Sequence, residues 1–517
     1  MNEGWAVRVV AVLLAGGLLT ARGVSQTAPA AAGAQATGTA AQGAGGRSFG
    51  PAIGVPTSGM PFVHDPSTVV RFHGKYYVYS TGRGISFYSS PDGVTWTREG
   101  SVFDKIPDEV HASVPKNDGT GVWAPDIIRV GGLFYLYYAV SSWGSFNSVV
   151  ALATNPVLDP KDPAYKWTDR GVVVSSDGKE DLNAIDPGAI LTPDGQLWIC
   201  YGSYHGSIRV TQLDPKTGLP LRPKELGAPV ATARESEASD IISHDGYFYL
   251  FVNHGSCCKG SASEYSIRVG RSRAVDGPYV DKHGVALASG GGSLFLAAHD
   301  HRIGPGHFGR LLDYAEQADG AERFSVHYEA DLTRGGRSVL DIRPLLWSVD
   351  GWPVAGDNLV DGAYQIVSRQ SENTLEERVA AGTAGAAAGA STALPATPNA
   401  PLVTPTAAAS AAPVARLARY LSLANQRWTI TPVDGGFYKI VNGATGNALG
   451  TAADGAGVSL SAYSGADGQM WHLDQFPDGG WRIRNKMGLS LRMMDGGVLA
   501  LAPFARDDLH LWTITTP

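Results

Sequence analysis

The chain has 517 residues, of which 44% are hydrophobic, enough for two to four domains with cores of their own. Only 17% are charged, whereas 65 are glycine and 31 are proline, a composition that favours turn-rich β structure and excludes a coiled coil or a helical array. The net charge is −7 and there is no dense run of lysine and arginine, so we expect no nucleic-acid and no membrane partner.

The first segment is typical of a secretory signal peptide. A short start containing Arg8 precedes an apolar run, Val9 to Leu19, that is too short to span a bilayer stably. We therefore assign residues 1–25 to a signal peptide and expect a secreted protein, extracellular or periplasmic. Residues 26–48 are rich in Ala, Gly, Thr and Gln, cannot bury enough apolar surface to fold, and are expected to form a disordered tether.

Residues 49–358 repeat one pattern, a glycine-containing turn followed by an aromatic-rich strand with alternating polarity. The copies are GKYYVYS, GLFYLYYAV, DGQLWICYGS, DGYFYLFVNHG and the looser DGAERFSVHY, with turn glycines at Gly74, Gly132, Gly195, Gly246 and Gly320. Their spacings of 58, 63, 51 and 74 residues are those of repeated four-stranded sheets. We predict an all-β fold with a five-bladed β-propeller, and keep a Greek-key sandwich as the alternative.

Residues 361–517 contain a second repeat of three copies, each ending in a tryptophan tripeptide. The tripeptides are Gln426-Arg427-Trp428, Gln469-Met470-Trp471 and His510-Leu511-Trp512. The first copy is 31 residues longer than the second, close to the length of the Ala/Pro/Thr-rich tract at about 379–414. We predict a β-trefoil over 361–517, with this tract as a disordered insertion inside its first lobe.

The three cysteines, Cys200, Cys257 and Cys258, are an odd count, and two of them are adjacent. Adjacent cysteines rarely pair, and three cysteines alone make no zinc site. We interpret all three as buried thiols, in a fold that does not depend on disulfides.

Three carboxyl groups stand out as candidate catalytic residues. Asp65, Asp186 and Glu237 each lie nine residues before the turn glycine of their repeat, which places one acid from each of three blades at the same depth near the propeller axis. Asp126 lies only six residues before Gly132 and is shifted along its strand, either as a substrate contact or as an acid that binds backbone inside a blade. Two carboxyls facing each other across a sugar are what hydrolysis of a glycosidic bond needs, one as acid and one as base.

Five motifs, in this order, resemble those of glycoside hydrolase family 43, a propeller family. They are HDPST (64–68), VWAPD (122–126), AIDPGAI (184–190), ESEAS (235–239) and IGPGH (303–307). Within the family, segments 141–155 and 251–272 are similar to the arabinanases, and the resemblance covers about residues 49–356.

The resemblance implies an inverting hydrolase of α-1,5-linked arabinofuranose in arabinan. Asp65 would be the general base, Asp186 the modulator of pKa values and Glu237 the general acid. Ser239 stands where the family's acid motif usually has proline, and Glu235, two residues upstream, is the rival acid, but only Glu237 has the shared nine-residue offset.

The resemblance also implies a metal ion on the axis. His307 would bind one hydrated ion, which in this family is often calcium. Water would supply most of the shell, because calcium prefers oxygen ligands. The alternative is a histidine that only forms hydrogen bonds in its loop. Substrate contacts are expected, by resemblance and by their position just after inner strands, from Trp123, Trp143, Phe146, Asn147, Ser203 and Tyr204, with Asp126 as a further one.

The C-terminal region resembles ricin-type lectin domains, whose sugar pockets usually need an Asp early in each lobe. This chain has Glu376, Gly450 and Arg492 there, so the trefoil could bind polysaccharide or serve in docking or structure. Three functional alternatives remain: an exo-acting arabinofuranosidase or β-xylosidase of the same family, a non-catalytic carbohydrate-binding propeller, and a structural surface protein. The presence of all three carboxyls argues against the last two.

Overall fold

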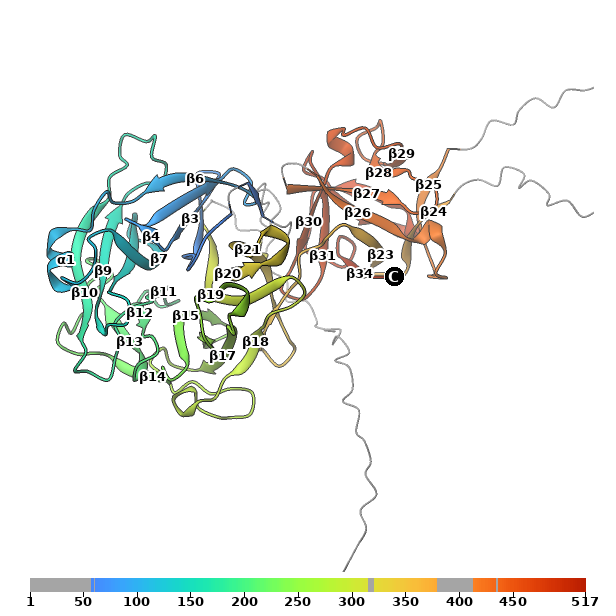
Figure 1. Ribbon diagram of the computed structural model, residues 1–517. Helices are drawn as coiled ribbons and strands as arrows, with labels where there is room; N and C mark the ends of the chain where they lie inside the picture. Colours follow the sequence, from blue (N-terminus) through green and yellow to red (C-terminus); the bar gives the residue numbers. More distant parts are fainter. Residues whose placement is uncertain (1–56, 60, 315–319, 379–411, 434–435) are drawn as a thin grey trace, which may run out of the picture.

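The computed structural model describes residues 57–59, 61–314, 320–378, 412–433 and 436–517. The expected signal peptide, the tether at 26–48 and residues 379–411 of the expected insertion lie outside this part of the chain. Two all-β domains lie side by side, a ring of sheets running from blue to yellow and a smaller orange-to-red domain (Figure 1). Among the described residues, no helix has the length and apolarity needed to cross a membrane.

The first domain is a five-bladed β-propeller, as predicted. Each blade is an antiparallel sheet built outward from an inner strand. Blades 1 and 2 consist of β2 (Val69–Phe72), β3 (Lys75–Ser80), β5 (Ser86–Ser90) and β6 (Thr95–Ser101), then β7 (Gly121–Val130), β8 (Leu133–Val140), β9 (Asn147–Asn155) and β10 (Thr168–Asp177). The short β1 (Ser58–Gly59) adds to β6, β4 (Gly82–Arg83) adds to β7, and α1 (Asp108–Ser113) lies between the two blades in sequence.

The remaining blades follow the same plan. Blade 3 consists of β11 (Gly188–Leu191), β12 (Leu197–Tyr201), β13 (Ser207–Leu213) and β14 (Ala228–Thr232), and blade 4 of β15 (Ser236–His244), β16 (Tyr247–His254), β17 (Ser266–Ser272) and β18 (Ser293–Leu296). Blade 5 consists of β19 (Arg302–Asp313), β20 (Arg323–Asp331), β21 (Arg337–Trp347) and β22 (Pro353–Ala355). The ring closes because β19 pairs in parallel with β2, Leu311 opposite Val69.

The sequence pattern explains both the turns and the cores of the blades. The five turn glycines have φ between 73° and 90°, a backbone region that other residues enter only with strain. The aromatic strands that follow them are buried on both faces. Hydrophobic clusters fill the spaces between neighbouring blades all round the ring, for example Val70 and Tyr77 of blade 1 against Ile127 and Phe134 of blade 2.

The second domain is the predicted β-trefoil. Its three lobes are β23 (Gly362–Ser368), β24 (Thr374–Arg378), β25 (Val414–Ala418) and β26 (Trp428–Val433); β27 (Phe437–Asn442), β28 (Ala448–Thr451), β29 (Val458–Ser461) and β30 (Trp471–Gln475); β31 (Trp481–Asn485), β32 (Ser490–Met493), β33 (Leu499–Ala502) and β34 (Trp512–Thr515). The three tripeptide tryptophans are fully buried, and each indole N–H donates to a leucine carbonyl of its own lobe, at Leu375, Leu449 and Leu491.

The Ala/Pro/Thr tract connects the second and third strands of the first lobe. β24 and β25 flank it and pair antiparallel, with Arg378 opposite Val414. Residues 412–414 are described, and Val414 already belongs to β25, so the expected insertion ends before that residue.

The trefoil contacts the propeller through buried charged groups. An Arg323 guanidinium nitrogen in β20 lies 2.9 Å from one Asp474 oxygen in β30, and Arg482 binds the other oxygen at 2.6 Å. Burial opposes ionisation of Asp474, but the two guanidinium groups outweigh it and lower its pKa. Val94, from the outer hairpin of blade 1, packs with the trefoil core, so the two domains share apolar contacts as well.

Candidate active site

Each inner strand has a residue in the left-handed backbone region, either within the strand or shortly before it. These residues are Asp65, Ala124, Asp186, Ala238 and His307, with φ between 43° and 58°, and Glu235, with φ 59°, is a second one in blade 4. Irregular pairing marks the same place in β7, β15 and β19, which indicates a β-bulge at the strand entrance. A bulge bends the strand and re-aims a side chain, which here directs polar groups towards the ring axis.

Although all three acids lie nine residues before a turn glycine, they do not occupy equivalent backbone positions in their blades. Asp65 and Asp186 occupy the left-handed position, whereas in blade 4 Ala238 does and Glu237 precedes it. The equal counts hide turns of different length: two residues join β2 to β3, but residues 192–196 join β11 to β12. The structure nevertheless brings the three carboxyls close enough for each to influence the protonation of another.

Asp65 lies in a cluster of histidines and accepts hydrogen bonds on both carboxylate oxygens. Thr81 Oγ1 donates to Oδ2 at 2.6 Å, His64 Nδ1 lies 2.9 Å from the same oxygen, and His307 Nδ1 lies 3.4 Å from Oδ1. Burial alone would raise the pKa of Asp65, but the charge of His64 and the hydrogen bond from His307 lower it well below its usual range. Asp65 is therefore ionised at neutral pH.

Two residues of blade 5, Glu329 and His327, contact the Asp65 cluster and could not be identified from the sequence. Glu329 Oε1 lies 3.2 Å from His64 Nε2, so His64 bridges two carboxylates. Burial lowers the pKa of His64, but attraction to Asp65 and then Glu329 raises it to about 11, which keeps the ring charged. His327 accepts the backbone N–H of Asp65 on Nδ1 at 3.3 Å, and burial lowers its pKa, so this ring is neutral.

Glu237 has the opposite environment. Its carboxyl is buried, accepts a hydrogen bond from Ser203 Oγ at 2.7 Å, and is within reach of the Tyr204 hydroxyl. Burial raises its pKa, the bond from Ser203 lowers it, and the charge of Asp65 raises it again, to about 7 overall. Glu237 can therefore carry a proton near neutral pH while Asp65 does not.

Asp186 interacts electrostatically with both of these acids. Its Oδ2 accepts the backbone N–H of Ala238 at 3.2 Å. Burial, then the charge of Glu237, then that of Asp65 raise its pKa well above the usual range. Three neighbouring carboxyls cannot all ionise in one buried site, so the charge rests on Asp65.

The expected substrate contacts fall into two groups. Ser203 and Tyr204 directly adjoin Glu237. The others lie on blade 2: Trp143, 80% exposed, stands with its ring 6.0 Å from that of Trp123, and Phe146 stacks on His205 at 4.1 Å. Asn147 begins β9, directly after this aromatic loop.

Asp126 has a different position from that of a substrate contact. It is buried, and its two carboxylate oxygens accept the backbone N–H groups of Thr68 at 2.9 Å and Ala189 at 2.8 Å. It joins the inner strands of blades 1, 2 and 3 by accepting one backbone N–H group from blade 1 and one from blade 3. These contacts favour the second of the two alternatives, an acid that binds backbone.

His307 supplies one imidazole to the axis. Its backbone N–H donates to Asn253 Oδ1 at 3.1 Å, and its Nδ1 faces Asp65, which leaves Nε2 for a ligand. Asn253 Nδ2 beside it is buried without a hydrogen-bond partner in the described residues, but an N–H group does not bind a cation. His307 Nε2 is therefore the one ligand atom of this pair, and an ion bound to it would be mostly hydrated.

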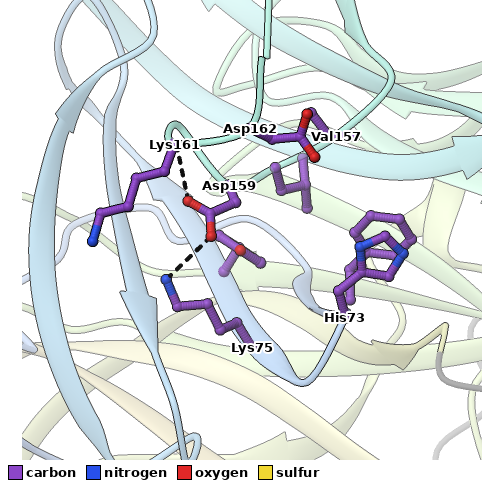
Figure 2. A pocket seen from close by; sticks show the side chains of 9 residues that line it. His73, Lys75, Val157, Asp159, Lys161 and Asp162 are labelled. Carbon is purple, nitrogen blue, oxygen red and sulfur yellow. Dashed lines mark hydrogen bonds and ion pairs between the residues drawn. The ribbon is translucent and has the colours of Figure 1, made fainter. Parts of the chain in front are cut away.

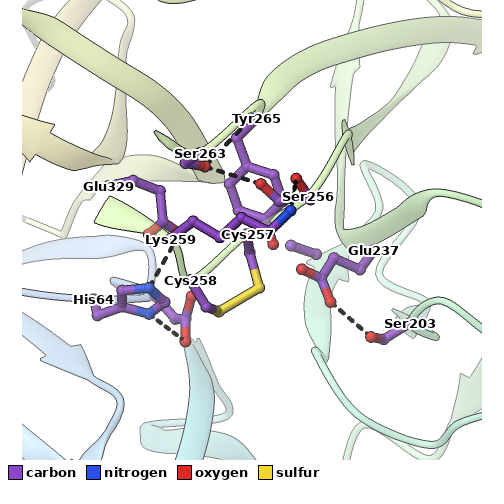
Figure 3. The surroundings of a disulfide bond; sticks show 12 residues. His64, Ser203, Glu237, Ser256, Cys257, Cys258, Lys259, Ser263, Tyr265 and Glu329 are labelled. Atoms are coloured by element: carbon purple, nitrogen blue, oxygen red, sulfur yellow. Dashed lines mark hydrogen bonds and ion pairs between the residues drawn. A yellow bond between two sulfur atoms is a disulfide. The ribbon is translucent and has the colours of Figure 1, made fainter. Parts of the chain in front are cut away.

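The interpretation of Cys257 and Cys258 as thiols is wrong, because the two residues form a disulfide (Figure 3). Cys200 is a buried thiol, as expected. A separate hollow of about 260 Å³ lies at the β2–β3 turn, lined by residues including His73, Lys75 and Asp159 (Figure 2). Within it Lys75 pairs with Asp159 at 3.6 Å, and none of the three candidate acids lines it.

Both domains of the chain resemble known proteins. The family model for glycosyl hydrolases family 43 matches residues 60–353, and the model for ricin-type beta-trefoil lectin domain-like proteins matches residues 424–497. The extracellular exo-alpha-(1->5)-L-arabinofuranosidase of Cellvibrio japonicus is 36% identical over 58% of this chain and 88% of its own length. The extracellular endo-alpha-(1->5)-L-arabinanase 1 of Bacillus subtilis is 33% identical over 56% and 87%.

Solved structures extend the similarity to the propeller as a whole. The endo-arabinanase of Bacillus licheniformis superposes with a TM-score of 0.53 at 34% identity, covering 58% of this chain and 99% of its own. The alpha-L-arabinanase of Cellvibrio cellulosa, solved with arabinohexaose, gives 0.53 and 34% over 57% and 95%. The chain belongs to glycosyl hydrolases family 43: it is a glycoside hydrolase with a propeller catalytic domain and a C-terminal ricin-type β-trefoil.

Proposed function

We propose that this protein is a secreted hydrolase that cleaves α-1,5-L-arabinofuranosidic bonds inside arabinan chains, with inversion at the anomeric carbon. The observation that carries the mechanism is the contrast between two carboxyls in one site, Asp65 held ionised by histidines and Glu237 with its pKa raised to about 7. Two titratable groups whose environments push their pKa values apart are suited to act as base and acid. The names of the relatives support arabinan as the substrate.

The proposed reaction is one displacement by water. Asp65 removes a proton from a water molecule as the water oxygen bonds to the anomeric carbon, and Glu237 donates its proton to the leaving glycosidic oxygen. The new bond is C–O to water, the broken bond is C–O to the next sugar, and Asp65 ends protonated while Glu237 ends ionised. Asp186 keeps the protonation of Glu237 coupled to the charge of the site.

His307 is proposed as the residue that binds a calcium ion through Nε2, with water completing the shell. The ion would add positive charge on the propeller axis near Asp65. Among this chain's own residues, His307 donates to Asp65, and Asn253 fixes the backbone of His307.

Secretion is supported by the Val9–Leu19 apolar run and by the word extracellular in the names of two relatives. For the trefoil, the contacts of the first lobe favour docking over sugar binding. Glu376 Oε1 pairs with Arg416 at 2.6 Å and its Oε2 accepts from Gln426 at 2.9 Å, so the carboxylate is already engaged.

An exo-acting arabinofuranosidase is the second candidate, because the Cellvibrio japonicus relative carries that activity in its name. Chromatography of products from linear and branched arabinan distinguishes the two. Oligosaccharides from wild type, released early in the reaction, support endo action, and arabinose alone supports exo action.

The acid assignment is tested by Glu237→Gln, with Glu235→Gln as the matched control. Glu235 lies two residues upstream with a side chain 70% exposed. We expect Glu237→Gln to lose at least about 1,000-fold in kcat on arabinan and Glu235→Gln to remain within about twofold. Proton NMR of the first-formed anomer tests inversion, and retention of configuration would refute the proposed mechanism.

A further inference from the structure

The disulfide between Cys257 and Cys258 joins neighbours in the chain. A disulfide stabilises a fold mainly by closing a loop, and the effect grows with the length of the loop. This bond closes a ring that contains only the peptide between the two residues, so it ties no two elements of the propeller together. Its effect is local: it makes this stretch rigid and places two polarisable sulfur atoms side by side.

The disulfide lies beside the candidate active site. Cys257 is partly buried and Cys258 is exposed, in the loop that follows β16. In Figure 3 the sulfur bridge stands between His64 and Glu329 on one side and Glu237 with Ser203 on the other. These are side chains of the Asp65 cluster and of the proposed acid.

One hydroxyl group connects the disulfide loop to the acid. The Tyr204 hydroxyl donates to the Gly255 carbonyl oxygen at 2.7 Å, accepts the backbone N–H of Cys257, and reaches the Glu237 carboxyl. Within the loop, Ser263 Oγ and the Glu264 N–H both bind the Ser256 carbonyl oxygen at 3.0 Å. The loop is therefore held in one position relative to Glu237.

We propose that the Cys257–Cys258 disulfide is a substrate-binding surface, on which an arabinofuranose ring next to the cleaved bond packs its apolar face. The inference rests on the proposed function, because it takes the sugar chain as the ligand. A furanose ring has C–H groups on one face and hydroxyls at its edge, so it gains from a flat apolar partner with polar groups around it. The sulfurs supply the apolar surface, and Ser203, Tyr204 and Glu237 supply the polar groups.

The first experiment establishes the bond and its effect on binding. Intact mass after alkylation with iodoacetamide under native conditions should show no adduct on Cys257 or Cys258 before reduction and one on each after reduction with a phosphine. Arabinotriose is then titrated calorimetrically into the Glu237→Gln protein, oxidised and reduced. We expect the dissociation constant to rise about tenfold on reduction, the scale of one lost apolar contact in a sugar pocket.

A variant without thiols gives the same comparison without a reductant. The double change Cys257→Ser with Cys258→Ser should raise KM for arabino-oligosaccharides about tenfold, leave kcat within about threefold, and leave the thermal midpoint unchanged. Ser261→Ala, an exposed residue of the same loop, is the matched control and should alter none of these values.

Each other outcome overturns the inference. If both cysteines of the protein as isolated are alkylated, there is no disulfide. If arabinotriose binding is unchanged after reduction, the disulfide does not bind the sugar. If the thermal midpoint and kcat of the double variant fall together, the pair stabilises the loop and does not bind substrate. Should the double variant fail to fold, the reduced wild-type chain still decides. If oxidised wild type neither binds arabinotriose nor cleaves arabinan, the proposed function is itself refuted.

Discussion

Removing the Ser203 hydroxyl should move the alkaline limb of the activity profile upward. Ser203 Oγ donates to Glu237 Oε2 at 2.7 Å in a buried place, and this bond stabilises the ionised carboxylate. Without it the ionised form loses stability relative to the acid, so the pKa of Glu237 rises above its present value of about 7. A hydrogen bond to a charged group contributes about 1.5–3 kcal/mol and one pKa unit equals about 1.4 kcal/mol.

Since water can replace part of the lost bond, we expect a shift of about one unit in Ser203→Ala. The acid form of Glu237 is the active one, so kcat/KM on linear arabinan should stay high to a pH about one unit above the wild-type limit. The acidic limb should not move, because Ser203 does not contact Asp65. Ser207→Ala is the control, since its buried hydroxyl has no partner in the described chain. An unchanged or lowered alkaline limb would refute the assignment of Glu237 as the acid.

Three further changes test other parts of the structure. Asp126→Ala should lower the free energy of unfolding by about 2–4 kcal/mol, because two buried N–H groups lose their acceptor, and denaturant titration measures this loss. Trp471→Ala should lower the free energy of unfolding of the trefoil by about 3–5 kcal/mol, because this indole is fully buried. A urea unfolding transition with the wild-type midpoint would contradict its place in the core. Arg323→Ala should loosen the docking of the trefoil through Asp474 and increase the radius of gyration in X-ray scattering, while kcat on soluble arabino-oligosaccharides stays near wild type.

Repetition made the fold readable from the sequence. Five copies of a turn glycine followed by an aromatic strand predict five blades, and three tryptophan tripeptides predict a trefoil, because each copy repeats the same local physics. The surplus length of the first trefoil copy placed the insertion between two strands that do pair in the structure.

From the sequence, only those candidate site residues that lie in short motifs could be identified. Asp65, Asp186 and Glu237 could be selected by counting, although the bulges and turn lengths show that the count is not an equivalence of backbone position. Glu329 could not be found in this way, because it reaches His64 across 265 residues of sequence. The one local indication in the sequence is that His327 and Glu329 lie two residues apart on β20, which places both on one face of the strand.

The cysteine pair was misread, and the two alternatives for Asp126 stayed open, for a different reason. Asp126 depends on backbone N–H groups from two other blades, and Cys257 and Cys258 depend on a loop geometry that brings adjacent sulfurs together. Sequence preferences describe how an average cysteine pair or an average Asp-containing strand behaves. Whether these two cysteines pair, and what this Asp contacts, depends on long-range packing.

The parallel pairing of β19 with β2 makes the proposed base dependent on the joint between the two ends of the propeller chain. Asp65 and His64 come from its start, whereas His307, His327 and Glu329 come from its end. Opening this joint would separate the carboxylate from the positive charge that keeps it ionised, while four blades could keep their strands. Hydrolytic activity would thus disappear before the circular-dichroism signal, and the rate of hydrolysis reports how completely the ring is closed.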